Sequence, residues 1–356
     1  MAYKDVYVRV AIMQNESSFD LDISGSYQIV DAKNNSRLYR GRNLKTKVVV
    51  APEGFYIGEL NFKENKIIIR PRHPDSIRIN GRRFRGDIIL VNKKSGILAI
   101  NILNLEDYLK GVLYHEISHY WPMEAIKAQA VVSRTFALYQ TIANKDKEFD
   151  LTCDIYSQVY GGRTSERWRT VKAVDKTRGL VIKYEGKILP AYFHATCGGM
   201  TEDVANLWNM DLPPLKGVVC GFCQKSPHIN WHYDLALDEL RSILNNKAGY
   251  KINLIKDIIV RERSKSGRIM KLEIITDDKK INISAKDFRN LIGPHVIRST
   301  NFQIEIKDGT VKFQGIGWGH GVGMCQWGAY FMAKKGAHYD EIIKYYYPGV
   351  KIGDVD

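Results

Sequence analysis

Pro122 divides the most helix-prone stretch of the chain, residues 108–139, and so constrains how this stretch can fold. A proline lacks a backbone N–H and pushes the residue before it, here Trp121, toward extended angles. We therefore predict two helices with a corner between them. The first begins near Asn104, a suitable N-cap, and the second begins at Pro122 and is rich in alanine.

The corner contains a single carboxylate, Glu116, in an aromatic and apolar setting that includes Tyr114, Tyr120 and Trp121. Burial against such neighbours disfavours the charged form and would raise the pKa of Glu116. A carboxyl group that remains protonated near neutral pH can act as a general acid. Glu116 is therefore the candidate catalytic residue, and a solvated surface glutamate is the alternative.

The same corner spells H-E-x-x-H with His115, Glu116 and His119, the pattern of zinc peptidases. That pattern binds zinc when both histidines lie one turn apart on a continuous helix. Because Pro122 follows only three residues after His119, we expect the motif to fall in a closing turn or corner. A zinc peptidase is therefore the least favoured of the functional readings.

The second helix, predicted over residues 122–141, carries small residues on every side and should be buried. Gln129 and Ser133 are four apart and share one face, and Arg134 lies on the neighbouring face. Buried polar groups need partners. These three side chains either pair with backbone or an aspartate, or they line a cleft beside Glu116.

A glycine-rich stretch near the C-terminus, residues 313–325, centres on His320. Alternate glycines at this density indicate special backbone angles or the close approach of another group. The spacing matches neither a P-loop nor a dinucleotide-binding fingerprint. His320 either packs against backbone or belongs to a site, and its place inside the glycines favours a site. Helices are predicted to follow over residues 326–335 and 339–346.

The cysteines indicate a second, separate site. Cys220 and Cys223 form a C-x-x-C pair, with Cys197 upstream and His228 five residues downstream. Three thiols and one imidazole can form a closed tetrahedral zinc site. We therefore predict structural zinc bound by Cys197, Cys220, Cys223 and His228, with a disulfide or a redox pair as alternatives. Cys325 is expected to be a small buried residue and not a metal ligand.

Composition and charge limit the classes of partner and of membrane attachment that can be expected. The 356 residues carry a formal charge of +14, with a pI near 9.3, which favours anionic partners. No helix-turn-helix, RNP or zinc-finger spacing is found, so we expect anionic wall polymers and no nucleic acid. No apolar run is long enough for a transmembrane segment, and the N-terminal residues lack the apolar core of a signal peptide.

The order of elements predicts an α+β fold, with a β-rich N-terminal unit packed on a mixed helix and strand catalytic core. The N-terminal domain is expected over residues 1–100, where Asn80-Gly81 indicates a hairpin. The core is expected over residues 101–356. It includes a Cys-rich loop, residues 197–228, and a β-rich segment, residues 250–312.

Five motifs in this order resemble the SpoIID/LytB family, that is, stage II sporulation protein D and the LytB amidase enhancer. They are Y-L-K-G-V before Glu116, W-P-M-E-A-I-K-A-Q-A-V-V-S-R-T-F-A-L after it, Q-V-Y-G-G at residues 158–162, C-G-G-M-T-E at residues 197–202 and G-W-G-H-G-V-G-M-C-Q-W-G-A. The resemblance covers nearly the whole chain, and the two long motifs are the specific ones.

The resemblance implies a function in the cell envelope, outside the cytoplasmic membrane. Sporulation members are lytic transglycosylases that cut peptidoglycan glycan strands already stripped of stem peptides. Their catalytic glutamate matches Glu116. The resemblance also places five further residues in or near the substrate cleft: Gln129, Ser133, Arg134, His320 and Gln326. The LytB name implies the alternative of a non-catalytic enhancer that binds a cell-wall amidase.

Some sporulation-type relatives bind zinc through cysteine and histidine residues just before the Gln-x-Tyr segment. This chain has Cys153 there, but Tyr156 and Ser157 stand where further ligands would be needed. The resemblance therefore gives a second possible place for zinc, distinct from the C-x-x-C loop.

Overall fold

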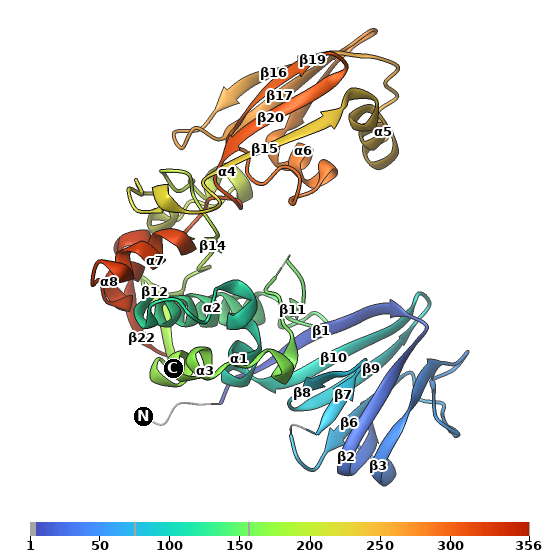
Figure 1. Cartoon of the computed structure of the whole chain (residues 1–356). Helices are drawn as coiled ribbons and strands as arrows, with labels where there is room; N and C mark the ends of the chain where they lie inside the picture. Colours follow the sequence, from blue (N-terminus) through green and yellow to red (C-terminus); the bar gives the residue numbers. More distant parts are fainter. Residues whose placement is uncertain (1–4, 75, 156, 356) are drawn as a thin grey trace. The chain divides into compact units, whose positions relative to one another are not determined.

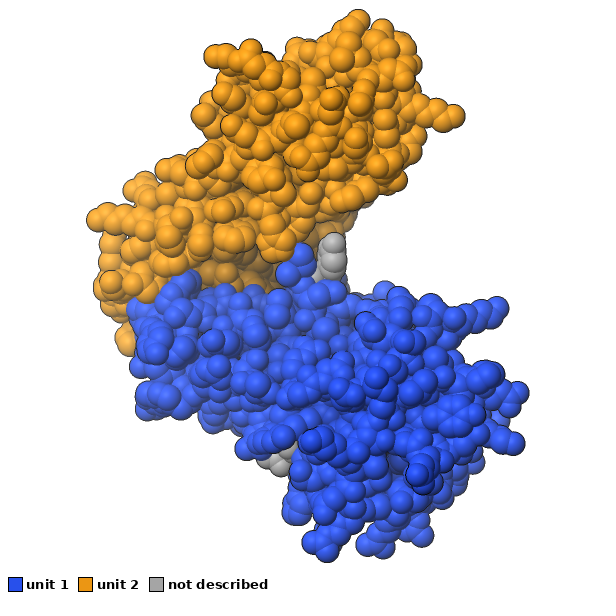
Figure 2. Space-filling view, turned by 45° about the vertical axis from the view of Figure 1, so that its right-hand side comes forward, with its two compact units in different colours: residues 1–190, 352–356 blue, residues 191–351 orange. Residues whose placement is uncertain are grey.

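The computed structural model describes residues 5–74, 76–155 and 157–355 (Figure 1). Helices make up 27% and strands 39% of the chain, which confirms the predicted α+β class. The chain divides into two compact units, coloured separately in Figure 2. Unit 1 comprises residues 1–190 and 352–356, and unit 2 comprises residues 191–351.

Unit 1 is built on a large mixed sheet in the order β11-β1-β10-β9-β6-β2-β3-β4-β5, with β7 pairing with β2 and β8. Its strands are β1 (Tyr7–Glu16), β2 (Ser18–Asp31), β3 (Arg37–Val50), β4 (Phe55–Ile57), β5 (Leu60–Phe62), β6 (Lys66–Pro71), β7 (Ile77–Ile79), β8 (Arg82–Phe84), β9 (Asp87–Lys93), β10 (Gly96–Asn104) and β11 (Leu151–Thr152). Neighbouring strands are antiparallel except β1 and β11, which pair in parallel.

The predicted hairpin at Asn80-Gly81 is confirmed. It joins β7 and β8 with φ of 46° at Asn80 and 77° at Gly81. Two successive positive φ angles match the right-handed twist of the strands, and asparagine followed by glycine tolerates them at low cost. A second turn with two positive φ angles, Glu185-Gly186, has φ of 48° and 78° and joins β12 (Leu180–Tyr184) to β13 (Lys187–Ile188).

Three helices complete unit 1: α1 (Leu105–Glu116), α2 (Met123–Ala143) and α3 (Trp168–Lys176). The 3₁₀ helix η1 (Gly162–Ser165) precedes α3, and β22 (Lys351–Asp354) pairs with β12. Helix α1 follows β10 without a break, because Asn104 is both the last residue of that strand and the N-cap of the helix. The boundary expected at residue 100 therefore falls inside this unit, within β10.

Unit 2 contains two three-stranded antiparallel sheets, β15-β20-β19 and β16-β17-β18, around one apolar core that also includes residues of α5 and α6. Its elements up to the glycine-rich stretch are β14 (Phe193–His194), α4 (Ala205–Trp208), η2 (Pro213–Leu215), η3 (Cys223–Lys225), β15 (Asn230–Ala236), α5 (Leu237–Ala248), β16 (Ile255–Arg263), β17 (Ile269–Thr276), β18 (Lys280–Ser284), α6 (Ala285–Ile292), β19 (Phe302–Lys307) and β20 (Thr310–Ile316).

The glycine-rich stretch leads into β21 (Met324–Cys325), α7 (Gln326–Lys334) and α8 (Tyr339–Tyr346). Both closing helices agree with the predicted ranges to within one residue. Strand β21 pairs in parallel with β14, so that His194 lies opposite Cys325. This short pairing brings together two segments that are more than a hundred residues apart. None of the helices in the described part of the chain is both long and apolar enough to cross a membrane.

Candidate functional site

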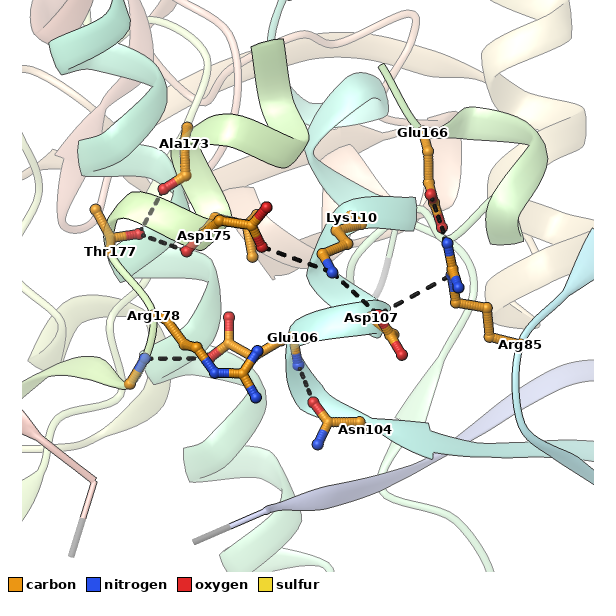
Figure 3. Close-up of polar contacts among 12 residues, drawn as sticks. Arg85, Asn104, Glu106, Asp107, Lys110, Glu166, Ala173, Asp175, Thr177 and Arg178 are labelled. Atoms are coloured by element: carbon orange, nitrogen blue, oxygen red, sulfur yellow. Dashed lines mark hydrogen bonds and ion pairs between the residues drawn. The ribbon is translucent and has the colours of Figure 1, made fainter. Parts of the chain in front are cut away.

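Helix α1 carries Glu116 at its C-terminal end, and a side-chain cap fixes its start. The Oδ1 atom of Asn104 accepts the backbone N–H of Glu106 at 2.9 Å (Figure 3). Glu106 and Asp107 place negative charge in the first turn, where it interacts favourably with the helix dipole. The predicted N-cap is thus confirmed, and the helix is held at a defined register after β10.

Ion pairs bind α1 to its surroundings (Figure 3). Lys110 lies 3.2 Å from the carboxylate of Asp107 and 3.6 Å from that of Asp175 on α3. Arg85 lies 2.7 Å from Glu166 and 4.0 Å from Asp107. These acids are therefore neutralised by nearby cations.

The helix ends at Glu116, because Ile117 is extended with φ −143° and ψ 157°. The side chain of Glu116 is half-buried. The corner that follows is held from α3: Nε of Arg169 donates to the carbonyl of His119 at 2.7 Å, and Nη2 donates to that of Trp121 at 2.9 Å. The predicted corner before Pro122 is confirmed, and α2 starts one residue later than expected.

This geometry removes the basis for a zinc peptidase at H-E-x-x-H. His115 lies in the last turn of α1, whereas His119 lies beyond the helix end. Nε2 of His115 is 2.6 Å from Oγ of Ser165, and the ring of His119 packs against Tyr120 with centroids 4.0 Å apart. Among the described residues, neither histidine belongs to a group of side chains placed to hold a metal.

The Q-V-Y-G-G motif lies beside α1. The hydroxyl of Tyr108 donates to Oε1 of Gln158 at 3.3 Å, and the rings of Tyr108 and Tyr160 are 5.1 Å apart. Burial, with a smaller contribution from the charge of Glu116, raises the pKa of Tyr108 well above its usual value. Glu116 therefore lies within electrostatic reach of this buried tyrosine. Nε2 of Gln158 is buried with no hydrogen-bond partner among the described residues.

The three polar residues predicted on α2 are all buried. Nε2 of Gln129 donates to Oγ of Ser133 at 3.0 Å, which confirms that they share a face. Arg134 is 0% exposed and forms a two-point ion pair with Glu106, with Nε–Oε1 at 2.8 Å and Nη2–Oε2 at 2.7 Å. A fully buried guanidinium bound in this way supports a positioning function for Arg134, in place of the substrate contact that was predicted.

His320 is half-buried and bonded to backbone. Its Nδ1 accepts the N–H of Val322 at 3.1 Å, and its ring lies edge-on to Trp208 and His194. Burial and then the charges of Arg289 and Arg268 lower the pKa of His320 to about 3. His320 is therefore neutral at pH 7, which suits hydrogen bonding through the ring and not electrostatic attraction of an anion.

A buried arginine lies behind the glycines. Nη2 of Arg268 donates to the carbonyl of Cys197 at 2.9 Å, and Nη1 donates to that of Gly319 at 3.3 Å. Gly321 has φ of +93°, and a Cβ there would collide with the Arg268 guanidinium. Glycine is thus required at this position for both reasons given in the sequence analysis, the backbone angle and the close approach of another group.

Gln326 begins α7 and is 7% exposed. Gln326 and His320 belong to unit 2, whereas Glu116 and the polar residues of α2 belong to unit 1. The structure describes each group within its own unit, so the single cleft implied by the resemblance stays a prediction.

The group of candidate metal ligands in the structure differs from the predicted set in one residue. Cys197, Cys220 and Cys223 lie together as expected, but the fourth member of the group is Cys325. Cys325 is buried as predicted, yet it lies among the candidate ligands and not apart from them. The imidazole of His228 instead packs edge-on against Trp318, with ring centroids 4.8 Å apart. Cys153 lies elsewhere, with its Sγ 3.6 Å from the carbonyl of Ile12. Tyr156 of that second possible zinc segment lies outside the described residues.

Two residues that hold the elements around Glu116 in place, Glu106 and Arg169, were missed from the sequence. Glu106 lies in the first turn of α1, and nothing in its spacing indicates a partner 28 residues away in Arg134. Arg169 precedes no recognisable motif. The signal that could have found Glu106 is that polar side chains of a buried helix, Arg134 among them, need partners, which directs attention to acids on neighbouring elements.

Comparison with known proteins gives matches along the chain. A family model described as stage II sporulation protein matches residues 93–184, and one described as a domain of unknown function matches residues 217–323. The first range contains α1, α2 and the Q-V-Y-G-G motif, and the second contains all strands of the two three-stranded sheets of unit 2.

Individual relatives extend these matches. An uncharacterized protein of Brachyspira hyodysenteriae is 36% identical over 98% of this chain and 93% of its own length. The stage II sporulation protein D of Bacillus amyloliquefaciens is 29% identical over 72% of this chain and 76% of its own. The amidase enhancer of Bacillus subtilis is 26% identical over 96% of this chain and 55% of its own.

Proposed function

Because this chain belongs to the SpoIID/LytB family, we propose that it acts on the bacterial cell wall as a peptidoglycan lytic transglycosylase, with Glu116 as its acid and base. The substrate would be a glycan strand stripped of stem peptides, cut between N-acetylmuramic acid and N-acetylglucosamine. Its site of action would be outside the cytoplasmic membrane. The observation that carries the proposal is the position of Glu116, half-buried where α1 ends at an aromatic corner.

The chemistry needs one carboxyl group and no water. Glu116 first donates its proton to the glycosidic oxygen as the bond to C1 of the N-acetylmuramic acid ring breaks. The carboxylate then takes the proton of the C6 hydroxyl of the same ring. That oxygen attacks C1 and closes a 1,6-anhydro ring, and Glu116 ends the cycle protonated. Ordinary glycosidases use two carboxyl groups because they must also form a covalent intermediate or activate water.

The surroundings of Glu116 support the protonated starting state. Glu116 is the last residue of α1, where the negative end of the helix dipole disfavours a carboxylate. Tyr114 and Tyr120, which flank it in sequence, are 36% and 80% exposed. Arg167 lies 4.1 Å from the centroid of the Tyr114 ring and His119 packs against the Tyr120 ring, so a sugar could stack only on the remaining face of either ring.

The test is the Glu116→Gln variant incubated with purified glycan strands from which an amidase has removed the stem peptides. Glutamine has the same size but cannot donate and accept a proton in turn. We expect the fold to persist by circular dichroism and the anhydro products, followed by mass spectrometry, to disappear. The matched control is Glu148→Gln, the same substitution at an exposed ion pair with Lys93. Full activity of Glu116→Gln would exclude the assignment.

A second function is favoured by one observation, the match of 96% of this chain to a relative named amidase enhancer. In that case the protein would bind a cell-wall amidase and stimulate it without cutting glycan. The experiment above separates the two when it is run with and without an added amidase. Anhydro products from the protein alone support the transglycosylase, whereas stimulation of amide cleavage that persists in Glu116→Gln supports the enhancer.

A further inference from the structure

We infer that unit 2 holds a structural zinc ion bound by Cys197, Cys220, Cys223 and Cys325. This site is independent of the proposed glycan chemistry and differs in its fourth ligand from the one expected from the sequence. All four cysteines are buried, with exposed fractions of 1% for Cys197 and 0% for the other three. Their sulfur atoms all lie within 4.8 Å of one another.

The spacing of the sulfur atoms fits a tetrahedral zinc site. Zinc–sulfur bonds of about 2.3 Å place the sulfur atoms of a tetrahedron about 3.8 Å apart. The Sγ atoms of Cys197 and Cys223 are 3.4 Å apart, and no pair in the group exceeds 4.8 Å, so the observed range brackets this value. The C-x-x-C spacing of Cys220 and Cys223 is also a usual spacing of zinc ligands on a loop.

The sulfur atoms already accept hydrogen bonds of the kind that stabilise metal-bound thiolates. Sγ of Cys325 accepts the backbone N–H groups of Cys197 and Gly328, each at 3.3 Å. Sγ of Cys197 accepts the N–H of Gly199 at 3.4 Å. Such outer contacts orient the ligands of a metal and offset the negative charge that four thiolates carry.

Two residues of the closing helices shape the site. The hydroxyl of Tyr346 on α8 lies 3.1 Å from Sγ of Cys220. A Cβ at Gly328 would lie 3.1 Å from the same sulfur and would collide with the Tyr346 hydroxyl. Glycine at this position therefore lets α7 approach the sulfur cluster. The Tyr346 hydroxyl and the backbone at Gly328 thus pack closely against the sulfur atom of Cys220.

The site is closed, which indicates a structural and not a catalytic ion. With four protein ligands, zinc has no open position for water or substrate. The four ligands come from three segments: the turn after β14, the loop that contains η3, and the N-cap of α7 at Cys325. A zinc ion would therefore lock the start of α7, and the glycine-rich stretch before it, onto the loop.

Three other states of the cluster make different predictions. Two disulfides would leave no thiol in the group and bind no metal. Ligation by His228 would place a nitrogen atom in the first shell, although that ring packs against Trp318. Iron bound by four thiolates would give a coloured protein, whereas zinc has no visible absorption.

The experiment is metal analysis of the full chain, purified under reducing conditions, exposed to zinc chloride and desalted, with X-ray absorption at the zinc edge. We expect one zinc per chain and a shell of four sulfur atoms at about 2.3 Å. A nitrogen atom in the shell, stoichiometric iron, or no retained zinc would each overturn the proposal. So would a mass that shows two disulfides in the protein as isolated.

Variants give an independent readout. Cys325→Ser should lose most of the bound zinc, whereas His228→Ala and the matched control Cys153→Ser should each retain one zinc per chain. If Cys325→Ser does not fold, the absorption spectrum of the unaltered chain still decides the ligand set. Loss of zinc in His228→Ala with retention in Cys325→Ser would overturn the assignment. The Glu116→Gln variant should bind zinc normally. A failure of the zinc proposal can therefore be told apart from a failure of the proposed glycan chemistry.

Discussion

Arg134 on α2 and Glu106 on α1 form a two-point ion pair that is buried on both sides, with the side chains 0% and 1% exposed. The Arg134 guanidinium also donates to the carbonyls of Val174, at 3.2 Å, and Leu180, at 3.1 Å. Oε1 of Glu106 also accepts the backbone N–H of Gly179 at 3.2 Å. One side-chain pair thus joins both helices to the end of α3 and the strand that follows.

Breaking this pair from one side should destabilise unit 1 strongly. Arg134→Met keeps much of the side-chain length but leaves the Glu106 carboxylate buried without its partner, so we expect a loss of about 3–5 kcal/mol in the free energy of unfolding. Urea unfolding measures it. Glu148→Gln, which removes the half-exposed pair with Lys93, should change stability by less than about 1 kcal/mol. Equal effects of the two variants would contradict the structural assignment of Arg134.

The corner after Glu116 should depend on Arg169. Arg169→Met removes both hydrogen bonds to the carbonyls of His119 and Trp121, and loosens the segment beside the proposed catalytic acid. We expect anhydro-product formation to fall about 10- to 100-fold with the fold intact. Amide hydrogen exchange of residues 117–121 should increase in parallel.

Two further variants show whether Arg169 acts by position. Arg169→Lys keeps the positive charge but lacks the planar guanidinium that donates to both carbonyls at once. It should therefore recover only part of the rate. Lys176→Met is the matched control, an exposed cation on the same helix. A normal rate in Arg169→Met together with faster exchange would show that the corner is not needed for the chemistry.

Local signals predicted much of the fold. Asn104 as N-cap, the corner before Pro122 and the hairpins at Asn80-Gly81 and Glu185-Gly186 each depend on the backbone preferences of one or two residues. Such preferences act within a few residues and can be recognised in a single sequence. The placement of Glu116 at the corner before Pro122 follows from the same signals.

Contacts between distant segments could not be predicted in this way. Cys325 joins the cysteine cluster through the pairing of β14 with β21, strands of two residues each, too short to give an alternation pattern. His228 was the nearer candidate by spacing, yet the structure packs it against Trp318. Likewise, the boundary expected at residue 100 divides β10 because a change from strands to helices along the chain need not coincide with a change of compact unit.

His320 should make the protein sensitive to acid. Its pKa of about 3 in the fold lies below the ordinary value of 6.5, so the unfolded chain binds a proton more readily. The contribution of the neutral ring is therefore complete above pH 6.5 and is lost as the pH falls from 6.5 toward 3. Within that window, one proton taken up on unfolding changes the free energy of unfolding by about 1.4 kcal/mol per pH unit.

Urea unfolding of the His320→Asn variant at several pH values tests this. The variant has no imidazole at this position to protonate. Its free energy of unfolding should therefore fall less steeply with acid than that of the unaltered chain, by about 1.4 kcal/mol per pH unit within this window. His232→Asn, the same substitution at an exposed position, is the matched control. Parallel curves for His320→Asn and the unaltered chain would show that this ring does not carry the acid sensitivity.

Gly321 should tolerate alanine less well than a glycine of similar backbone angle elsewhere. Gly309 has φ of +71° and no atom within 4 Å of an added Cβ, so Gly309→Ala should cost only the strain of a left-handed angle, about 1–2 kcal/mol. At Gly321, with φ of +93°, the Cβ would also displace the buried Arg268 guanidinium from the carbonyls of Cys197 and Gly319. We expect about 1–3 kcal/mol more for Gly321→Ala, measured by urea unfolding of both variants. If the two variants lose equal stability, the guanidinium can move without cost, and the glycine serves only the backbone angle.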